Sequence, residues 1–151
     1  MASARRPVWG DLATTAFVES SHLFKSVDPD ARRDLLQVAT LLDLAPGEVV
    51  PTPEVSGESF YLVRDGSASV LVAAGDGTVE IARLERGAFF GEALVLGGGR
   101  PASLAALTDV TVVAFPALVI AAIGERFPKV RKLLEAVHAA RERDAADRLA
   151  S

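Results

Sequence analysis

The segment from Gly87 to Leu104 has the sequence GAFFGEALVLGGGRPASL. Gly91 stands between an apolar strand end and a short helix-forming run, so we expect a single helical turn to begin where a strand ends. The backbone N–H groups of that turn, from Gly91 to Leu94, would point the same way and form a site for an anion. Glycines 97–99 then return the chain to Arg100, whose guanidinium can bind two oxygens of one phosphate.

Glu92 lies in the same turn, where its carboxylate would repel a bare anion. Its position therefore favours a ligand that carries a hydroxyl beside a phosphate, and a sugar phosphate carries both. Simpler explanations exist for each residue. Glu92 can favour the helix dipole, Arg100 can be a surface arginine or pair with Glu92 across an empty pocket, and Phe89, Phe90 and Leu94 can serve packing alone. Each explanation is adequate for its own residue, but these explanations do not account for the occurrence of all these residues in one segment.

On both sides of this segment, short apolar runs alternate with turn residues, which is typical of a β-sandwich or barrel. Gly75-Asp76-Gly77 joins two of these runs and predicts a hairpin. The expected runs are Leu41–Leu44, Glu48–Val50, Phe60–Val63, Ser67–Ala73, Val79–Leu84, Leu104–Leu107 and Val110–Phe115.

Helices are expected before and after the β region, within one domain that spans residues 1–151. Residues 1–40 would form N-terminal helices, 41–115 the barrel, and 116–151 two C-terminal helices. Asp28 is expected as an N-cap with Pro29 at the first helical position. The two C-terminal helices are expected over Ala117–Gly124 and from Pro128 to about Leu149. In the second of these, a stripe of apolar side chains would pack on the barrel of the same chain or on a partner, and the last two turns would form a solvated charged tail. The stripe is Val130, Leu133, Leu134 and Val137, and the tail is Arg141, Glu142, Arg143 and Asp144.

The composition excludes several classes of protein. The chain has 151 residues and a net charge of −4, from 16 basic and 20 acidic side chains, which argues against nucleic-acid binding. It has no cysteine, which excludes disulfides and thiolate chemistry. No segment has the length of a membrane span or the pattern of a secretory signal, so we expect a cytoplasmic protein. The two histidines, His22 and His138, are expected in helices at opposite ends of the chain, where they predict no metal site. No motif for a nucleophile or a phosphate loop is present, so we expect no enzyme.

The segment from Phe90 to Leu104 resembles the phosphate-binding cassette of cyclic-nucleotide-binding domains, in which F-G-E is followed by a small-residue loop and then by R-x-A-S-L. Three further motifs of that family occur around it in the expected order. They are Leu44–Val50 (LAPGEVV), Phe60–Gly66 (FYLVRDG) and Leu84–Phe90 (LERGAFF), and Leu23–Asp28 is similar to the entry helix of the family.

The resemblance implies a mainly β fold with flanking helices, an eight-stranded jelly-roll barrel, also called a double-stranded β-helix. It also implies that the cassette glutamate binds the ribose 2′-hydroxyl, that the arginine and the first-turn amides bind the cyclic phosphate, and that a C-terminal helix closes over the base. Carried over, the ligand-binding residues are Gly91, Glu92, Ala93, Leu94, Arg100, Pro101, Ala102 and Ser103. Pro101 departs from the pattern because it has no backbone N–H for the phosphate, and the loop Gly97–Gly99 is slightly shorter than usual.

These inferences lead to a cyclic-nucleotide sensor module, with cAMP as the expected ligand and cGMP as the other candidate. Binding would move the C-terminal helices, and an effector protein or a second copy of the chain would bind through the last helix. No cofactor, metal, nucleic acid or membrane is expected. The alternative is a degenerate barrel that binds no nucleotide and serves protein interaction or dimerisation. Pro101 and the short loop favour that alternative, whereas Gly91, Glu92 and Arg100 oppose it. A transcription regulator of the catabolite-activator type is disfavoured because no helix-turn-helix follows before Ser151, although a fragment would look the same.

Overall fold

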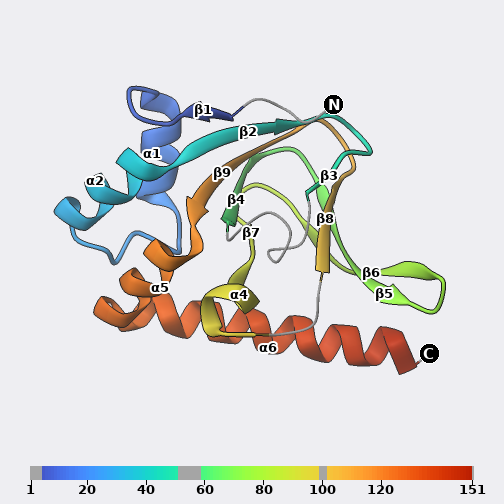
Figure 1. The fold of residues 1–151 in the computed structure, drawn as a ribbon. Helices are drawn as coiled ribbons and strands as arrows, with labels where there is room; N and C mark the ends of the chain where they lie inside the picture. Colours follow the sequence, from blue (N-terminus) through green and yellow to red (C-terminus); the bar gives the residue numbers. More distant parts are fainter. Residues whose placement is uncertain (1–4, 51–58, 99–101, 151) are drawn as a thin grey trace.

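Two antiparallel sheets face each other, and helices pack at one end of them (Figure 1). Residues 5–50, 59–98 and 102–150 are those that this computed structural model describes. The elements within these ranges are β1 (Arg5–Pro7), α1 (Leu12–Ser20), α2 (Pro29–Val38), β2 (Thr40–Leu44), β3 (Val49–Val50), β4 (Ser59–Asp65), β5 (Ala68–Ala74), β6 (Gly77–Leu84), β7 (Phe89–Phe90), α4 (Glu92–Leu96), β8 (Ala102–Ala106), β9 (Val110–Pro116), α5 (Ala117–Arg126) and α6 (Pro128–Ala150).

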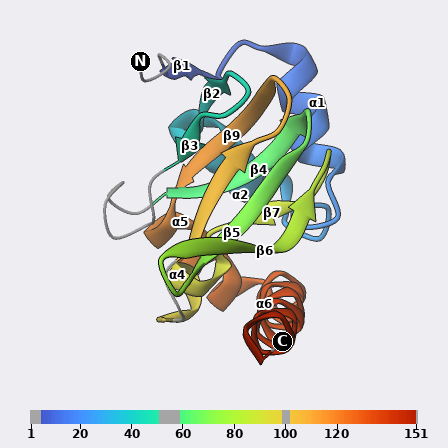
Figure 2. The same cartoon turned by 90° about the vertical axis from the view of Figure 1, so that its right-hand side faces the viewer.

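The strand order is β1-β2-β9-β4-β7 in one sheet and β3-β8-β5-β6 in the other (Figure 2). Seven of the eight strands from β2 to β9 match the apolar runs expected from the sequence, and the eighth, β7, is the Phe89–Phe90 strand end. The β5–β6 hairpin is confirmed, with Ala74 paired to Gly77 across its turn. The expected β fold with flanking helices is therefore confirmed.

Strand β1 differs from the prediction, because residues 5–7 were expected to be helical. Arg5–Pro7 instead pairs with β2, with Arg6 opposite Leu41. A proline disfavours helical backbone in the residue before it, so Arg6 is extended. The Arg6 guanidinium also binds the Asp43 carboxylate at 2.6 Å, which holds the short strand on the edge of the sheet.

The five-stranded sheet is buried on both faces, which explains why its strands have continuous apolar sequences. Side chains alternate across a strand, so neighbouring residues enter different cores. In β4, Phe60 and Leu62 pack with the helices, whereas Tyr61 and Val63 pack inside the barrel. Strand β9 divides in the same way, and the two cores therefore share one sheet.

The N-terminal helix signals are confirmed at α2. The Asp28 carboxylate accepts a hydrogen bond from the Ala31 N–H at 2.9 Å, and Pro29 occupies the first turn. The segment from Leu23 to Val27 is a series of turns rather than a helix, and the exposed His22 lies just before it, outside any helix. Bonds such as that from the Val27 N–H to the Phe24 carbonyl close these turns.

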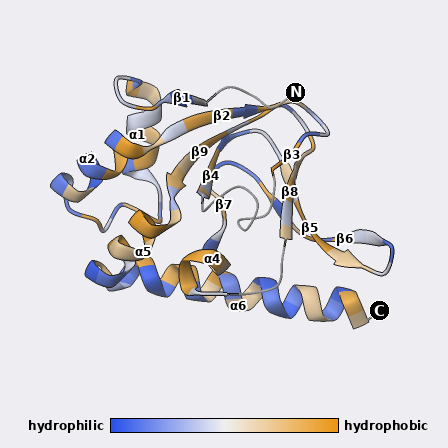
Figure 3. Cartoon of the chain, in the orientation of Figure 1, coloured by the Kyte–Doolittle hydropathy of each residue, from blue (hydrophilic) through white to orange (hydrophobic). Residues whose placement is uncertain are grey.

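The C-terminal helices depart from expectation at one boundary. Helix α5 continues past Gly124 to Arg126, because Gly124 is buried where α6 crosses and is not a helix end. A Cβ at Gly124 would lie 3.6 Å from the Arg131 Cβ, so the two helices pack closely there. Helix α6 then runs across the molecule and contacts α5, α4 and β6 (Figure 1). Figure 3 shows hydrophilic segments along α6, while α4 and α5 are mostly hydrophobic.

Candidate functional site

The segment that the sequence singles out begins where β7 meets α4. Gly91 has φ of 108°, a conformation that residues with a Cβ rarely adopt. A Cβ at Gly91 would lie 3.0 Å from the Ser59 carbonyl oxygen and 3.2 Å from the Phe60 Cα. The positive φ and the lack of space for a Cβ both require glycine at this position. This glycine allows α4 to begin directly at the edge of the sheet.

The expected single helical turn is confirmed as α4. Its first hydrogen bond runs from the Val95 N–H to the Gly91 carbonyl, at 3.3 Å. The N–H groups of Glu92, Ala93 and Leu94 precede that bond, so helix geometry gives them no acceptor within α4. The four cassette residues 91–94 thus lie together in one turn, as the sequence predicted.

Glu92 is buried, with 5% of its surface exposed. Its Oε1 accepts a hydrogen bond from the Arg141 Nη1 at 2.5 Å, and its Oε2 lies 3.4 Å from the His138 Nδ1. Both partners belong to α6. A carboxylate in the first turn also interacts favourably with the helix dipole of α4.

Arg141 joins α6 to the cassette through two groups. Besides the bond to Glu92, its Nη2 donates to the Phe89 carbonyl at 2.6 Å, and the guanidinium lies 5.6 Å from the centre of the Phe89 ring. Burial lowers the pKa of Arg141 from its ordinary value, while the Glu92 carboxylate opposes that shift. Arginine remains charged in proteins, so this is a buried ion pair.

This arrangement corrects, at Arg141, the expectation that residues 141–144 form a solvated charged tail. The Arg141 side chain is only 11% exposed, and Ala145 is fully buried in the barrel core. One turn later, the Arg148 Nη1 donates to the Glu80 carbonyl at 2.7 Å. Arg143, Asp144 and residues 146–150 are exposed.

Spacing was the signal that could have revealed this contact. His138, Arg141, Ala145 and Arg148 follow one another at intervals of three, four and three residues, which places them on one helix face. An apolar pattern does not show this face, because three of its four residues are polar. Long arginine side chains can nevertheless bury their aliphatic stems against a protein surface.

The other candidate residues fall into two groups. Ala102 and Ser103 lie on β8, opposite Val72 and Leu71 of β5, and are partly exposed. Arg100 and Pro101 lie outside the described residues, as does Gly99 of the glycine loop. The expected pairing of Glu92 with Arg100 therefore stays a prediction, while the observed cationic partner of Glu92 is Arg141.

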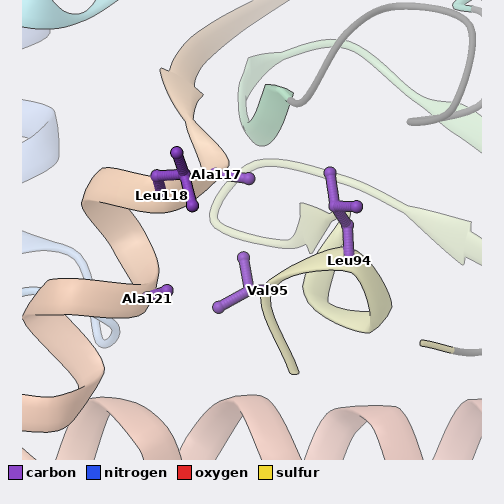
Figure 4. A pocket seen from close by; sticks show the side chains of 5 residues that line it. All are labelled: Leu94, Val95, Ala117, Leu118 and Ala121. Carbon is purple, nitrogen blue, oxygen red and sulfur yellow. The ribbon is translucent and has the colours of Figure 1, made fainter. Parts of the chain in front are cut away.

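A small apolar hollow lies between α4 and the start of α5, and five side chains line it (Figure 4). These are Leu94, Val95, Ala117, Leu118 and Ala121. The expected core role of Leu94 is thus only partly met, because its side chain borders this hollow. The lining carries no charged group, so the hollow does not match a phosphate.

Within residues 5–50, 59–98 and 102–150, no three or more histidine, aspartate or glutamate side chains are placed to hold a metal ion. No helix in the same ranges is both long and apolar enough to cross a membrane.

Comparison with known proteins gives one family and several relatives. The family model described as "Cyclic nucleotide-binding domain" matches residues 41–126, more than half of the chain. The chain is 34% identical over 100 residues to the cGMP-dependent 3′,5′-cGMP phosphodiesterase A of Dictyostelium discoideum, which covers 65% of this chain and 11% of that protein. It is also 34% identical over 97 residues to the cAMP-dependent protein kinase regulatory subunit of Hypocrea atroviridis. This match covers 64% of this chain and 20% of that protein. The chain thus spans a fifth or less of the length of these relatives.

Solved structures show the same fold. The regulatory subunit of a cAMP-independent protein kinase A from Trypanosoma brucei, as a mutant bound to cAMP, matches with a TM-score of 0.72 at 17% identity, over 93% of this chain and 54% of that one. The sensor domain of the transcriptional regulator DNR from Pseudomonas aeruginosa matches with a TM-score of 0.69 at 19% identity, over 90% and 93% of the two chains. The catabolite activator protein of Thermus thermophilus matches with a TM-score of 0.64 at 27% identity, over 84% and 61%.

Proposed function

Because this chain belongs to the cyclic-nucleotide-binding domain family, we propose that it is a regulatory module that binds cAMP at the turn between β7 and α4. The observation that carries the proposal is the buried Glu92 at the start of α4, behind a glycine that no other residue could replace without strain. Acidic side chains are rarely buried, and this buried one lies in the segment that resembles the family's cassette.

Each cassette residue has a proposed role. The Glu92 carboxylate accepts a hydrogen bond from the ribose hydroxyl, and the amides of residues 91–94 donate to the cyclic phosphate. Arg100 supplies the positive charge, because a guanidinium can bind two phosphate oxygens at once. Ala102, Ser103 and Pro101 form the rim of the site.

We propose cAMP rather than cGMP as the preferred ligand. The position after Arg100 holds Pro101, which has neither a hydroxyl to offer guanine nor an N–H to offer the phosphate. The missing N–H weakens binding of both nucleotides, whereas the missing hydroxyl weakens binding of cGMP alone.

A regulatory role, without catalysis by this chain, fits the same residues. The described side chains that contact Glu92 are those of His138 and Arg141, and we assign these contacts to binding. Helix α6 contacts the cassette through α4, so a ligand at Glu92 would alter the position of α6. We propose that the chain acts in the cytoplasm and that an effector protein or a second copy of the chain binds α6.

Calorimetric titration with cAMP and with cGMP tests this function. We expect the parent protein to bind cAMP at least as tightly as cGMP, and Arg100→Ala to abolish or strongly weaken binding without lowering the melting temperature. The matched control is Arg33→Ala, which removes an exposed arginine from α2 and should leave binding unchanged. Equal affinity in the parent and in Arg100→Ala would contradict the role of Arg100, and a clear preference for cGMP would contradict the ligand choice.

One observation favours the second candidate, a barrel that binds no nucleotide and serves protein interaction. The Glu92 carboxylate already has two partners on α6, so its burial has a structural explanation as well. Absence of binding at millimolar cAMP and cGMP would establish this alternative. Tighter binding by Pro101→Ala than by the parent would oppose it, because that change restores the N–H that a phosphate needs.

A further inference from the structure

Aspartate precedes glycine at two places in the chain, Asp65-Gly66 and Asp76-Gly77, and the surroundings of the two pairs differ. We propose that Asp76 is a site of spontaneous modification, at which the residue rearranges to isoaspartate through a cyclic imide, whereas the contacts of Asp65 protect it from the same reaction. This inference does not depend on nucleotide binding. The chain has no asparagine, so no isoaspartate can arise in it by deamidation of asparagine.

The rearrangement balances without any reagent other than water. The backbone nitrogen of the next residue attacks the protonated side-chain carboxyl group of aspartate, a C–N bond forms, the nitrogen loses its proton and one water leaves. The cyclic imide then takes up one water. Opening at the side-chain carbonyl restores aspartate, whereas opening at the main-chain carbonyl leaves the chain connected through the side chain, which is isoaspartate. A following glycine favours ring closure because it has no Cβ beside the attacking nitrogen.

Asp76 is the second of the two residues that join β5 to β6. Ala74 pairs with Gly77, and Gly75 has φ of 59°, as the first central residue of a tight hairpin turn requires. Residues 75–77 are exposed, and the turn lies at the edge of the molecule (Figure 1). Within the part of the chain that the structure describes, no residue forms a hydrogen bond or an ion pair with Asp76. Its carboxyl group can therefore rotate toward the Gly77 nitrogen.

The attacking nitrogen of Gly77 also lies in open surroundings. A Cβ added at Gly77 would meet nothing within 4 Å. Gly77 is the first residue of β6, next to the turn, and such exposed ends of structure open more readily than the centre of a sheet. Opening of the hairpin end frees the Gly77 N–H for attack while the rest of the barrel stays folded.

Asp65 also precedes a glycine, but two arginines hold its carboxylate. One carboxylate oxygen lies 2.8 Å from the Arg64 Nε, and the other lies 3.2 Å from the Arg86 Nη1. Gly66 is enclosed, because a Cβ there would collide with the Asp109 carbonyl oxygen. Ring closure at Asp65 therefore requires the loss of both ion pairs and a movement of the following peptide group away from Asp109.

Isoaspartate at position 76 would lengthen the turn of the hairpin. It places one extra carbon in the main chain, which adds about 1.5 Å to the path. A two-residue turn has a fixed geometry, so we expect the pair of Ala74 with Gly77 to separate first. The register of β5 against β6 shifts between Val70 and Leu71, which interrupts the ladder. We expect the disturbance to end at that shift.

Ageing of the purified protein at neutral pH and physiological temperature tests the proposal. A carboxyl methyltransferase specific for isoaspartate transfers a labelled methyl group from S-adenosylmethionine and so counts the product, and peptide mapping locates it. Each rate in the folded protein is divided by the rate in a short synthetic peptide that contains the same aspartate–glycine pair. We expect this ratio to be at least about fivefold higher at Asp76 than at Asp65, because both ion pairs of Asp65 must break first.

Gly77→Ala should slow the reaction without disturbing the fold. Gly77 has no positive φ, and its added Cβ meets no neighbour, so alanine fits at this position. The Cβ shields the attacking nitrogen, and we expect the isoaspartate formed at Asp76 to fall severalfold. The matched control is Asp65→Glu, which keeps the negative charge and removes the other aspartate–glycine pair. It should leave the yield of isoaspartate unchanged.

The two positions give opposite outcomes for the proposal. A higher ratio at Asp76, together with a lower yield in Gly77→Ala, supports it. Equal ratios at the two positions, or a higher ratio at Asp65, would overturn it. An absence of isoaspartate at Asp76 in the folded protein, under conditions in which its peptide reacts, would overturn it as well.

Hydrogen exchange on the aged protein measures the structural effect. We expect faster exchange in residues 71–80, which form the end of the hairpin beyond the register shift, and unchanged exchange in β4. Unchanged exchange in residues 71–80 would contradict the expected opening of the turn. Faster exchange throughout the barrel would contradict the limit at the register shift.

Discussion

The two halves of α6 are held to the molecule by different kinds of interaction. In residues 128–137, Val130 and Leu134 are fully buried, and Leu133 and Val137 pack against the same core. In residues 138–150, Ala145 alone among the side chains is fully buried. Arg141 and Arg148 donate hydrogen bonds there to Glu92 and to the carbonyls of Phe89 and Glu80.

The first half of α6 is therefore fixed by apolar packing, whereas the second half is held by polar contacts that can be exchanged. Apolar burial in the first half cannot be lost without exposing core surface to water, which costs about 25 cal/mol for each Å². Polar contacts in the second half can be exchanged for contacts with water or with a ligand at a much smaller net cost. We therefore expect the second half to respond to the cassette while the first half stays in place.

The largest effect on stability is expected when a buried apolar side chain in the first half of α6 is shortened. Leu134→Ala removes a fully buried side chain, and we expect it to lower the free energy of unfolding by about 2–5 kcal/mol. Urea denaturation at neutral pH measures this change. Leu133→Ala, at a partly buried position, is the control and should lower it less. A similar loss in both variants would mean that the first half is not anchored through Leu134.

Removing the acidic partner of Arg141 should have the next largest effect. Glu92→Ala leaves the buried Arg141 with only the Phe89 carbonyl, and we expect a loss of about 1–3 kcal/mol. The loss is limited because the second half of α6 can move and expose Arg141 to water. Hydrogen exchange should therefore accelerate in residues 139–150 but not in residues 128–137. Uniform acceleration of exchange along α6 would contradict the division into two halves. The control is Glu135→Ala on the exposed face, which should not produce this pattern of exchange.

Arg148→Ala should have a smaller effect. Arg148 is exposed and donates one hydrogen bond to the Glu80 carbonyl, so we expect about 1 kcal/mol or less. The measurable change should be faster hydrogen exchange in the last turn of α6. If Arg148→Ala lowered stability as much as Glu92→Ala does, the second half of α6 would be held mainly by β6 and not by the cassette.

The smallest effect is expected in the titration of Glu80, on the strand beside the second half. A hydrogen bond from the Ser69 hydroxyl lowers the pKa of Glu80 below its ordinary value of 4.5, partial burial opposes the shift, and Arg83 and Arg148 add to it. A carboxyl group with a lowered folded-state pKa stabilises the fold above its unfolded pKa, and this stabilisation is lost as pH falls through the folded-state pKa.

Ser69→Ala should therefore raise the pKa of Glu80 and make stability less sensitive to acid. NMR titration of the Glu80 carboxyl group measures the first effect, and urea midpoints at neutral and acidic pH measure the second. An unchanged pKa in the variant would show that the Ser69 hydroxyl is not its main cause.

The elements that the sequence predicted well are those with local signals. The Asp28 cap, the hairpin between β5 and β6, and the turn at Gly91 each depend on a few adjacent residues. Strands β4 and β9 were recognisable because burial on both faces leaves continuous apolar sequence. In these regions, local preference and tertiary packing favour the same structure.

The features that the sequence did not predict depend on distant partners. Arg5–Pro7 is too short to be recognised as a strand, and it exists because β2 offers an edge. The second half of α6 has an ordinary charged sequence, and its role depends on Glu92, which lies 49 residues before Arg141. No property of either residue alone specifies that pairing. The proposed roles of Arg100 and Pro101 remain predictions, since both lie outside the described residues.

Helix α6 also has a geometric consequence as a lever. With 23 residues at a rise of about 1.5 Å each, it is roughly 34 Å long. A tilt of roughly 10° that begins at residue 138 would move about 20 Å of helix and displace its far end by about 3 Å, whereas the atoms near Glu92 would separate by less than that. We expect such a tilt to turn a small separation at Glu92 into a larger displacement at the end of the helix.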